Sequence, residues 1–257
     1  MSRKRTQCGV PFLLLRWAVP DSTTEPMTVS LTRPAAQQIN QGNFLDTPQL
    51  APGITRFWLI RHALVEQNAR LRLYGALDVP LCPDSLIAQR PMYEALAARL
   101  PREAHWLVSP LSRTRRTAEA IQDAGYGPVP MDVEPALIEQ NLGEWHNMPH
   151  QELPQHLRLA PHPFWSISAT ECPPGGESML DVCGRVGVTL DRLAEAYEGQ
   201  NIVAVSHGGA IRAALAHALR VHPETALHFS IQNLSLTILE RLDEGWRVVT
   251  VNELPGI

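Results

Sequence analysis

Two histidines follow closely on short apolar runs. His62 comes just after the run 56–60, and His207 comes just after the run 201–205. Short runs of aliphatic and β-branched residues are typical of buried parallel strands, and open α/β sheets bind ligands just beyond the carboxyl ends of their strands. We therefore expect both imidazole rings at one edge of a sheet, where a binding site would form.

Two arginines accompany these histidines. Arg61 directly precedes His62, and Arg113 follows a third apolar run at 106–108. A guanidinium group is permanently charged and binds paired oxygens, so arginines beside histidines favour a phosphate over a metal cation, which they would repel. The metal-binding spacings HxH, HExxH and CxxC are missing from the sequence. The sequence predicts a phosphate site that contains no metal.

Several further blocks occur in a fixed order between Arg56 and Asn252. They are Leu59–His62, Gly75–Leu81, Ser109–Arg113, Leu137–Glu139, Pro174–Ser178 and Val205–Arg212. In these blocks the chain resembles the histidine phosphatase superfamily, the phosphoglycerate mutase-like proteins. The resemblance implies an α/β fold, a three-layer α/β/α sandwich around a mostly parallel mixed sheet, with no cofactor and no metal.

The resemblance also assigns catalytic roles. It makes His62 the nucleophile that forms a phosphohistidine, and the alternative for this residue is a buried histidine hydrogen-bonded to backbone. Glu139 matches the proton donor that the leaving alkoxide needs, with Glu134, Glu144 and Glu66 as rivals. His207, in its protonated form, is expected to stabilise the transition state together with the arginines.

The phosphate-binding set is Arg61, Asn68, Arg113 and Gly208. The arginines bind the equatorial oxygens, and the backbone N–H groups of Gly208 and Gly209, at a predicted helix start, add donors. Asn68 lies six residues after His62, as in the family, although a plain turn-forming role explains it almost equally well. The Ser109 hydroxyl is expected only to make a small adjustment to the shape of the pocket.

The chain departs from the family pattern directly after the nucleophile. Where the family usually has Gly, an acidic or amide residue and Thr, this chain has Ala63, Leu64 and Val65. Polar contacts near the phosphate are thereby lost. This departure supports an alternative function, a weakly active phosphate-binding regulatory module.

The favoured function is hydrolysis of a small-molecule phosphate ester. A phosphoglycerate mutase-type phosphotransferase remains an alternative, but mutases need a second phosphate site and a basic insert, and residues 140–173 contain a single arginine, Arg158. A metal-dependent hydrolase that uses some of the ten histidines predicts clustered carboxylates, which are missing from the sequence.

Hydrophobic periodicity places the remaining elements. It predicts helices over 83–100, kinked or delayed by Pro91, over 113–124 and over 177–197, and a hairpin of 235–240 with 246–251. The Pro-rich stretch 149–174 is predicted to be an irregular insert near the site mouth, where Trp165 and Tyr74 could line a leaving-group pocket. Trp145 is expected in the core, and Arg185, Arg212 and Arg220 are expected to be solvated.

Composition limits the partners and the compartment. The 257 residues carry a net charge of −4 with a pI near 6.2, so neither nucleic acid nor membrane is an expected partner, whereas a homodimer remains open. The four cysteines are widely spaced, which predicts neither a zinc knuckle nor a disulfide scaffold and is consistent with the cytoplasm.

The N-terminal part of the chain has a different character. Residues 1–52 are rich in Pro, Thr, Gln and Asn and are predicted to be a disordered or loosely attached extension, with 53–257 as the histidine phosphatase domain. The basic residues 3–5 followed by the apolar run 10–15 imitate a secretory signal, although Arg16 ends that run early. A misassigned start upstream of Met27 is the other interpretation of this segment.

Overall fold

A six-stranded sheet in the order β3-β2-β4-β1-β5-β6 forms the centre of the computed structural model, which describes residues 53–243 and 245–256. The strands are β1 (Thr55–Arg61), β2 (His105–Val108), β3 (Met131–Val133), β4 (Asn201–Ser206), β5 (Leu236–Leu242) and β6 (Gly245–Glu253). β1 pairs in parallel with β4, and β2 pairs in parallel with both β4 and β3. β5 is antiparallel to β1, and β6 is antiparallel to β5.

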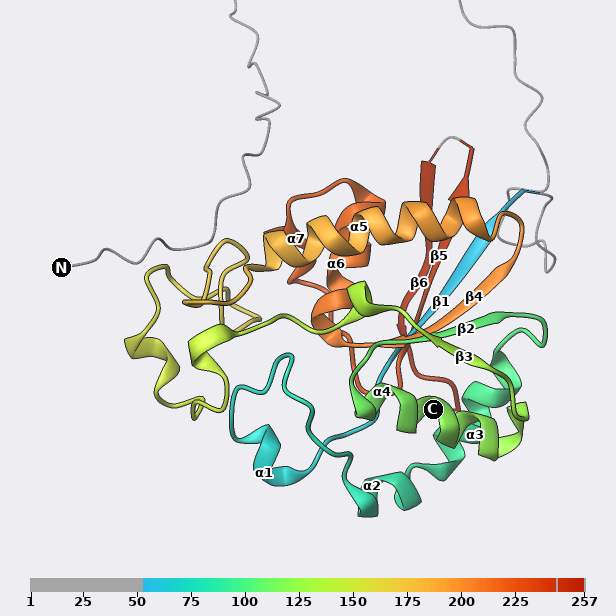
Figure 1. Ribbon diagram of the computed structural model, residues 1–257, viewed down its shortest axis with the longest axis horizontal. Coiled ribbons are helices and arrows are strands. Elements are labelled where there is room, and N and C mark those ends of the chain that lie inside the picture. The colour runs from blue at the N-terminus through green and yellow to red at the C-terminus, as the bar shows by residue number, and fades with distance from the viewer. Residues whose placement is uncertain (1–52, 244, 257) are drawn as a thin grey trace, which may run out of the picture.

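Helices cover both faces of this sheet (Figure 1). α5 (Met179–Ala196) and α6 (Gly208–Leu219) pack on one face, against Phe57 and Leu59 of β1. α3 (Arg90–Arg99) and α4 (Ser112–Ile121) pack on the other face, against Trp58 and Ile60. Successive strand residues point to opposite faces, which explains why residues 57–60 of β1 are all apolar. The predicted three-layer α/β/α sandwich with a mostly parallel mixed sheet is confirmed.

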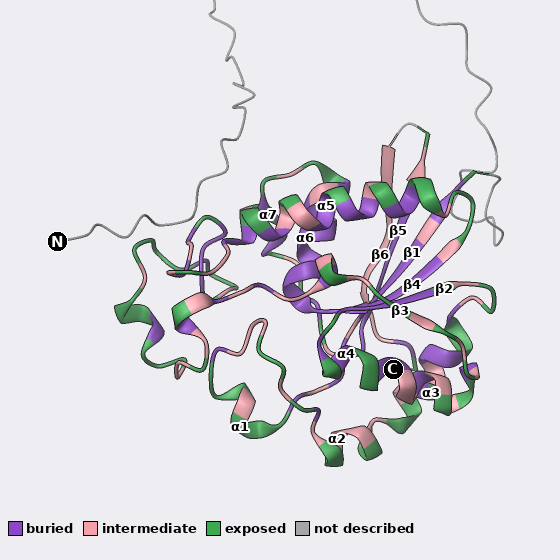
Figure 2. Ribbon diagram, in the orientation of Figure 1, coloured by how far each residue is buried: buried purple, intermediate pink, exposed green. Residues whose placement is uncertain are grey.

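The register of the two central strands sets the position of the histidines. Arg61 of β1 lies opposite Ser206 of β4, and the backbone N–H of His62 donates to the carbonyl oxygen of Ser206 at 2.9 Å. Because the two strands are parallel neighbours, His62 and His207 leave the sheet at the same edge. The two central strands, β1 and β4, are buried along most of their length (Figure 2).

The predicted helices form with adjusted boundaries. The segment 83–100 divides at Gln89 into α2 (Pro83–Ala88) and α3. Pro91 lies in the first turn of α3, where its missing N–H has no helical partner to lose. α5 begins after Ser178, which forms a capping box with Asp181. Met179 and Val182 of this helix are buried, whereas Leu180 is 39% exposed.

The insert 149–174 is irregular, as predicted, and contains only the short 3₁₀ helix η5 (Leu153–Gln155). Its Leu153 and Ile167 pack on Trp145, which is buried as expected, in a small apolar cluster beside the main core. The strand β3, at the sheet edge, was not predicted from the sequence. The other short elements are α1 (Gln67–Arg70), α7 (Pro223–Ala226), η2 (Gln122–Tyr126), η3 (Pro135–Leu137) and η4 (Gly143–Trp145).

The predicted extension 1–52 lies outside the described residues. Within residues 53–243 and 245–256, no helix combines the length and apolar character needed to cross a membrane.

Candidate active site

His62 is buried at the end of β1 with its ring orientation fixed. Its Nδ1 lies 2.7 Å from the carbonyl oxygen of Ala63. A carbonyl oxygen only accepts, so Nδ1 carries the proton, and in the neutral ring Nε2 then holds the lone pair. Burial, followed by the charges of Arg113 and Arg61, holds the pKa of His62 well below its usual value. At neutral pH the ring is therefore neutral.

His207 lies next to His62, with the two ring centroids 5.1 Å apart and the rings edge to face. Its Nε2 is 2.6 Å from the hydroxyl of Ser109. Burial, then Arg113, His62 and Arg61, lower the pKa of His207 well below its usual value. The expectation that His207 is protonated does not hold for this arrangement, because the cost of burial and the neighbouring positive charges both oppose a second proton.

Arg61 and Arg113 approach the histidines from different elements. Arg61 Nη1 donates to the carbonyl oxygen of Ile231 at 2.5 Å. Arg113 is fully buried on α4 and donates to the carbonyl oxygens of Leu77 and Gly75 at 2.6 and 2.7 Å. Burial lowers the pKa of Arg113, an effect that the nearby Glu139 carboxylate opposes.

Three buried nitrogens of these residues have no hydrogen-bond partner within the described part of the chain: Arg61 Nε, Arg113 Nε and His207 Nδ1. Buried polar atoms are normally paired, because an unpaired one costs about 1–3 kcal/mol. Both guanidinium nitrogens are donors, and His207 Nδ1 is a donor when the Ser109 hydroxyl donates to Nε2. A ligand with several acceptor oxygens would satisfy all three.

Glu139 brings a carboxylate to the first turn of α6. Its Oε2 accepts from the N–H of Gly209 at 3.0 Å, and its Oε1 accepts from the N–H of Gln140 at 2.9 Å. The Gly209 N–H is therefore bound to Glu139 and not directed to a ligand, which differs from the sequence-based expectation. Gly208 packs against the Arg61 guanidinium, where a Cβ atom would lie 3.5 Å from Cζ.

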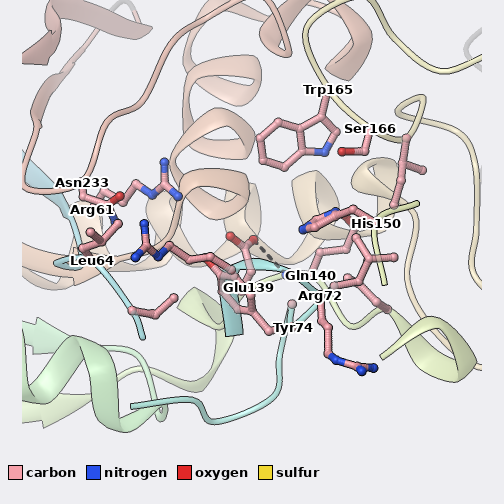
Figure 3. Close-up of a pocket in the computed structure, with 16 residues that line it drawn as sticks. Arg61, Leu64, Arg72, Tyr74, Glu139, Gln140, His150, Trp165, Ser166 and Asn233 are labelled. Atoms are coloured by element: carbon pink, nitrogen blue, oxygen red, sulfur yellow. Dashed lines mark hydrogen bonds between the residues drawn. The ribbon is translucent and has the colours of Figure 1, made fainter. Parts of the chain in front are cut away.

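Arg61 and Glu139 line a cavity of about 310 Å³ (Figure 3), whereas the buried His62, Arg113 and His207 are not among its lining residues. Trp165, Ser166 and Ile167 of the insert form one wall, so the insert does lie at the site, as predicted. Tyr74 also lines the cavity. Among the four glutamates considered, Glu139 is the one that lines it; Glu66 and Glu144 are exposed, and Glu134 pairs with Arg192.

Residues 57–254 match the model of the histidine phosphatase superfamily (branch 1). The chain belongs to this superfamily. It is 28% identical over 198 residues to phosphoglycerate mutase-like protein 4 of Arabidopsis thaliana, covering 74% of this chain and 81% of the relative.

Solved structures of this superfamily have the same fold. A mycobacterial glucosyl-3-phosphoglycerate phosphatase superposes with a TM-score of 0.65 at 25% identity, covering 77% of this chain and 99% of the other. The α-ribazole phosphatase of Shigella flexneri superposes with a TM-score of 0.63 at 24% identity, covering 79% and 98% of the two chains.

Asn68, which the histidine phosphatase pattern places near the phosphate, is exposed on α1 and does not line the cavity. Asn233 lies there instead, and its Nδ2 donates to the carbonyl oxygen of His62 at 2.7 Å. A single asparagine in a loop 171 residues away gives no sequence signal for this contact.

Two arginines that were expected to be solvated are part of the site's support. Arg185 Nη1 donates to the carbonyl oxygens of Ala136 and Ile138 at 2.6 and 2.8 Å, directly before Glu139. Arg212 is buried, and burial lowers its pKa to about 10. The expectation was wrong for both, because their partners are backbone carbonyls distant in sequence. Arg220 is exposed, as expected.

The described residues contain no group of three or more His, Cys, Asp or Glu side chains arranged to hold a metal ion.

Proposed function

We propose that this protein is a phosphatase that hydrolyses a small-molecule phosphomonoester through a phosphohistidine at His62. The observation that carries the proposal is the group of residues gathered around His62. The Nδ1 of His62 is engaged, which leaves the lone pair on Nε2, its ring lies against that of His207, and Arg61 Nε, Arg113 Nε and His207 Nδ1 have no partner among the described residues. A phosphoryl group would supply acceptor oxygens to all three donors and phosphorus to the nucleophile.

In the first step, the His62 Nε2 lone pair attacks phosphorus, a P–N bond forms and the ester P–O bond breaks. The leaving oxygen takes a proton from the carboxyl group of Glu139. This step requires the carboxyl group of Glu139 to carry a proton in the substrate complex. The substrate dianion favours protonation of His207, which would then fulfil its expected role only in the complex.

In the second step, water attacks phosphorus and gives a proton to the Glu139 carboxylate. The P–N bond breaks, inorganic phosphate leaves and Nε2 recovers its lone pair, so the cycle is balanced without a cofactor. The arginines stabilise the charge on the equatorial oxygens in both transition states.

The test is hydrolysis of a panel of phosphate monoesters with EDTA present, comparing the native chain with His62→Ala. We expect the variant to lose at least about 1000-fold in kcat/KM, as is usual when a nucleophile is removed. His105→Ala is the matched control, since His105 is an exposed residue of β2. Unchanged turnover in His62→Ala would overturn the proposal. Conversion of 3-phosphoglycerate to its 2-isomer, in place of phosphate release, would identify a mutase.

Mass spectrometry of the protein quenched during turnover tests the intermediate directly. We expect an acid-labile phosphoryl group on His62. Phosphate-dependent binding without turnover in the native chain would instead favour the regulatory module.

A further inference from the structure

The cavity beside the phosphate-binding residues has both an apolar and a polar lining. Arg61 and Glu139 line it. The apolar part of the lining is supplied by Leu64, Leu73, Leu142, Trp165 and Ile167, and the polar part also includes Arg70, Arg72, Gln140, His150 and Ser166. The ester oxygen would lie near Glu139, so the group attached to it would extend along these walls toward Trp165.

Trp165 is held as a fixed platform in this wall. The Arg212 guanidinium lies over its ring, with Cζ 4.3 Å from the centroid. Arg212 itself is fixed, because Nε donates to the carbonyl oxygen of Phe229 at 2.9 Å and Nη1 donates to that of Gly208 at 3.1 Å. Figure 3 shows the indole projecting over the side chains of Glu139 and His150. One indole face is thus covered by a cation, and the ring is preorganised to stack on a ligand.

Leu64 makes the start of the leaving-group path apolar. It stands where the family usually has an acidic or amide residue, and it lines the cavity next to Arg61. Val65, which replaces the usual Thr, is 1% exposed and packs in the core. The buried amide of Gln140 is already engaged, because its Nε2 donates to the carbonyl oxygen of Glu177 at 2.7 Å. A leaving-group hydroxyl packed against Leu64 would therefore be buried without a partner, which is costly.

We propose that the leaving group of the substrate is planar and mainly apolar, and that it stacks on Trp165. This inference rests on the proposed phosphatase function and names the substrate class. An aryl or heteroaryl alcohol fits this apolar wall better than a polyhydroxylated sugar or a phosphoglycerate. A cavity of about 310 Å³ is at the small end of the range for ligand sites, which suits a leaving group of one or two rings.

The test compares two esters of primary alcohols, so that their intrinsic reactivities are similar: 2-naphthylmethyl phosphate and glycerol 3-phosphate. We expect kcat/KM to be at least about tenfold higher for the naphthylmethyl ester. Trp165→Leu should remove most of that preference by lowering kcat/KM for the aromatic ester alone, and Trp165→Phe should restore part of it. Equal kcat/KM for the two esters, or an equal loss for both in Trp165→Leu, would overturn the inference.

Phe164→Leu is the matched control. Phe164 is the neighbour of Trp165 in the insert, but its ring is 65% exposed and packs on His162 and His228, outside the cavity lining. We expect this variant to keep both the activity and the preference of the native chain.

A binding measurement separates this inference from the proposed function. If neither ester is hydrolysed in a His62-dependent way, the function fails, and the non-hydrolysable 2-naphthylmethylphosphonate then decides the inference alone. We expect calorimetry to show at least about tenfold tighter binding than for methylphosphonate, and a loss of that difference in Trp165→Leu. Equal binding of the two phosphonates would overturn it.

Discussion

The N–H of Gly209 donates to Glu139 Oε2 at 3.0 Å, and a Cβ atom on Gly209 would lie 2.2 Å from Glu139 Oε1. A contact that short requires movement of one partner. The first turn of α6 therefore accepts the Glu139 carboxylate only because residue 209 is glycine.

Gly209→Ala should displace the proposed proton donor while the rest of the site stays in place. We expect kcat to fall by about 100-fold for an alkyl phosphate, whose leaving group needs a proton. The loss should be much smaller for para-nitrophenyl phosphate, whose leaving group is already a weak base. Steady-state kinetics with both esters is the measurement, and equal losses would contradict this role for Glu139.

Gly184→Ala is the matched control for this variant. Gly184 is also helical, on α5, and no heavy atom lies within 4 Å of the position of an added Cβ. We expect unchanged kinetics and a stability gain of about 0.4–1 kcal/mol from the less flexible unfolded chain.

Arg185 holds the segment before Glu139 through its bonds to Ala136 and Ile138 and through its ion pair with Glu177. Arg185→Met would remove the donor to these part-buried carbonyls, at a cost of about 1 kcal/mol in the free energy of unfolding. As a positioning residue, it should change kcat for alkyl phosphates more than KM, whereas a merely structural role would lower only stability. Arg192→Met is the control, since Arg192 lies on the same helix, is exposed and pairs with Glu134.

The sequence predicted the centre of the site because its signals are local. His62 and His207 each follow a strand, and parallel strands deliver such residues to one edge wherever they pair. Arg61 and Arg113 were identified in the same way. The three-layer fold followed from the alternation of apolar runs with helical periodicity, and Glu139 was identified by the family block around it.

The support of the site could not be predicted, because it consists of contacts between distant segments. In the sequence Arg212 and Arg185 are ordinary helical arginines. Their contacts become visible only in the fold, which brings Phe229 and Trp165 to Arg212 and Ala136 to Arg185. Asn68 shows the opposite case. It has the spacing from His62 that the family pattern predicts, but the structure leaves it exposed. The neutral state of His207 depends on burial and on the summed charges around it, neither of which is local in sequence.

The hydroxyl of Ser109 is hydrogen-bonded to His207 Nε2 at 2.6 Å. Ser109 therefore has a larger role than the small adjustment of pocket shape expected from the sequence. Ser109→Ala would leave Nε2 buried without this partner and free the ring to change its tautomer. We expect inorganic phosphate to inhibit about tenfold more weakly, as for one lost hydrogen bond to a charged group. Ser112→Ala is the control, because Ser112 is exposed and bonds to Asp78. The measurement is the inhibition constant of inorganic phosphate at pH 7. An unchanged constant in Ser109→Ala would contradict this role of Ser109.

The depressed pKa values of His62 and His207 predict how stability depends on pH. Below about pH 6.5 the unfolded chain binds a proton at each histidine, whereas the folded chain does not until the pH reaches the lower folded values. The free energy of unfolding should therefore fall as the pH drops below about 6.5, with these two groups contributing up to about 2.7 kcal/mol per pH unit. Denaturant unfolding at pH 7 and pH 5.5 measures this, and His62→Gln should lose about half of that contribution. An equal pH dependence of the free energy of unfolding in the two proteins would show that His62 titrates normally in the fold. In that case the acid limb of kcat/KM would appear near pH 6.5 instead of well below it.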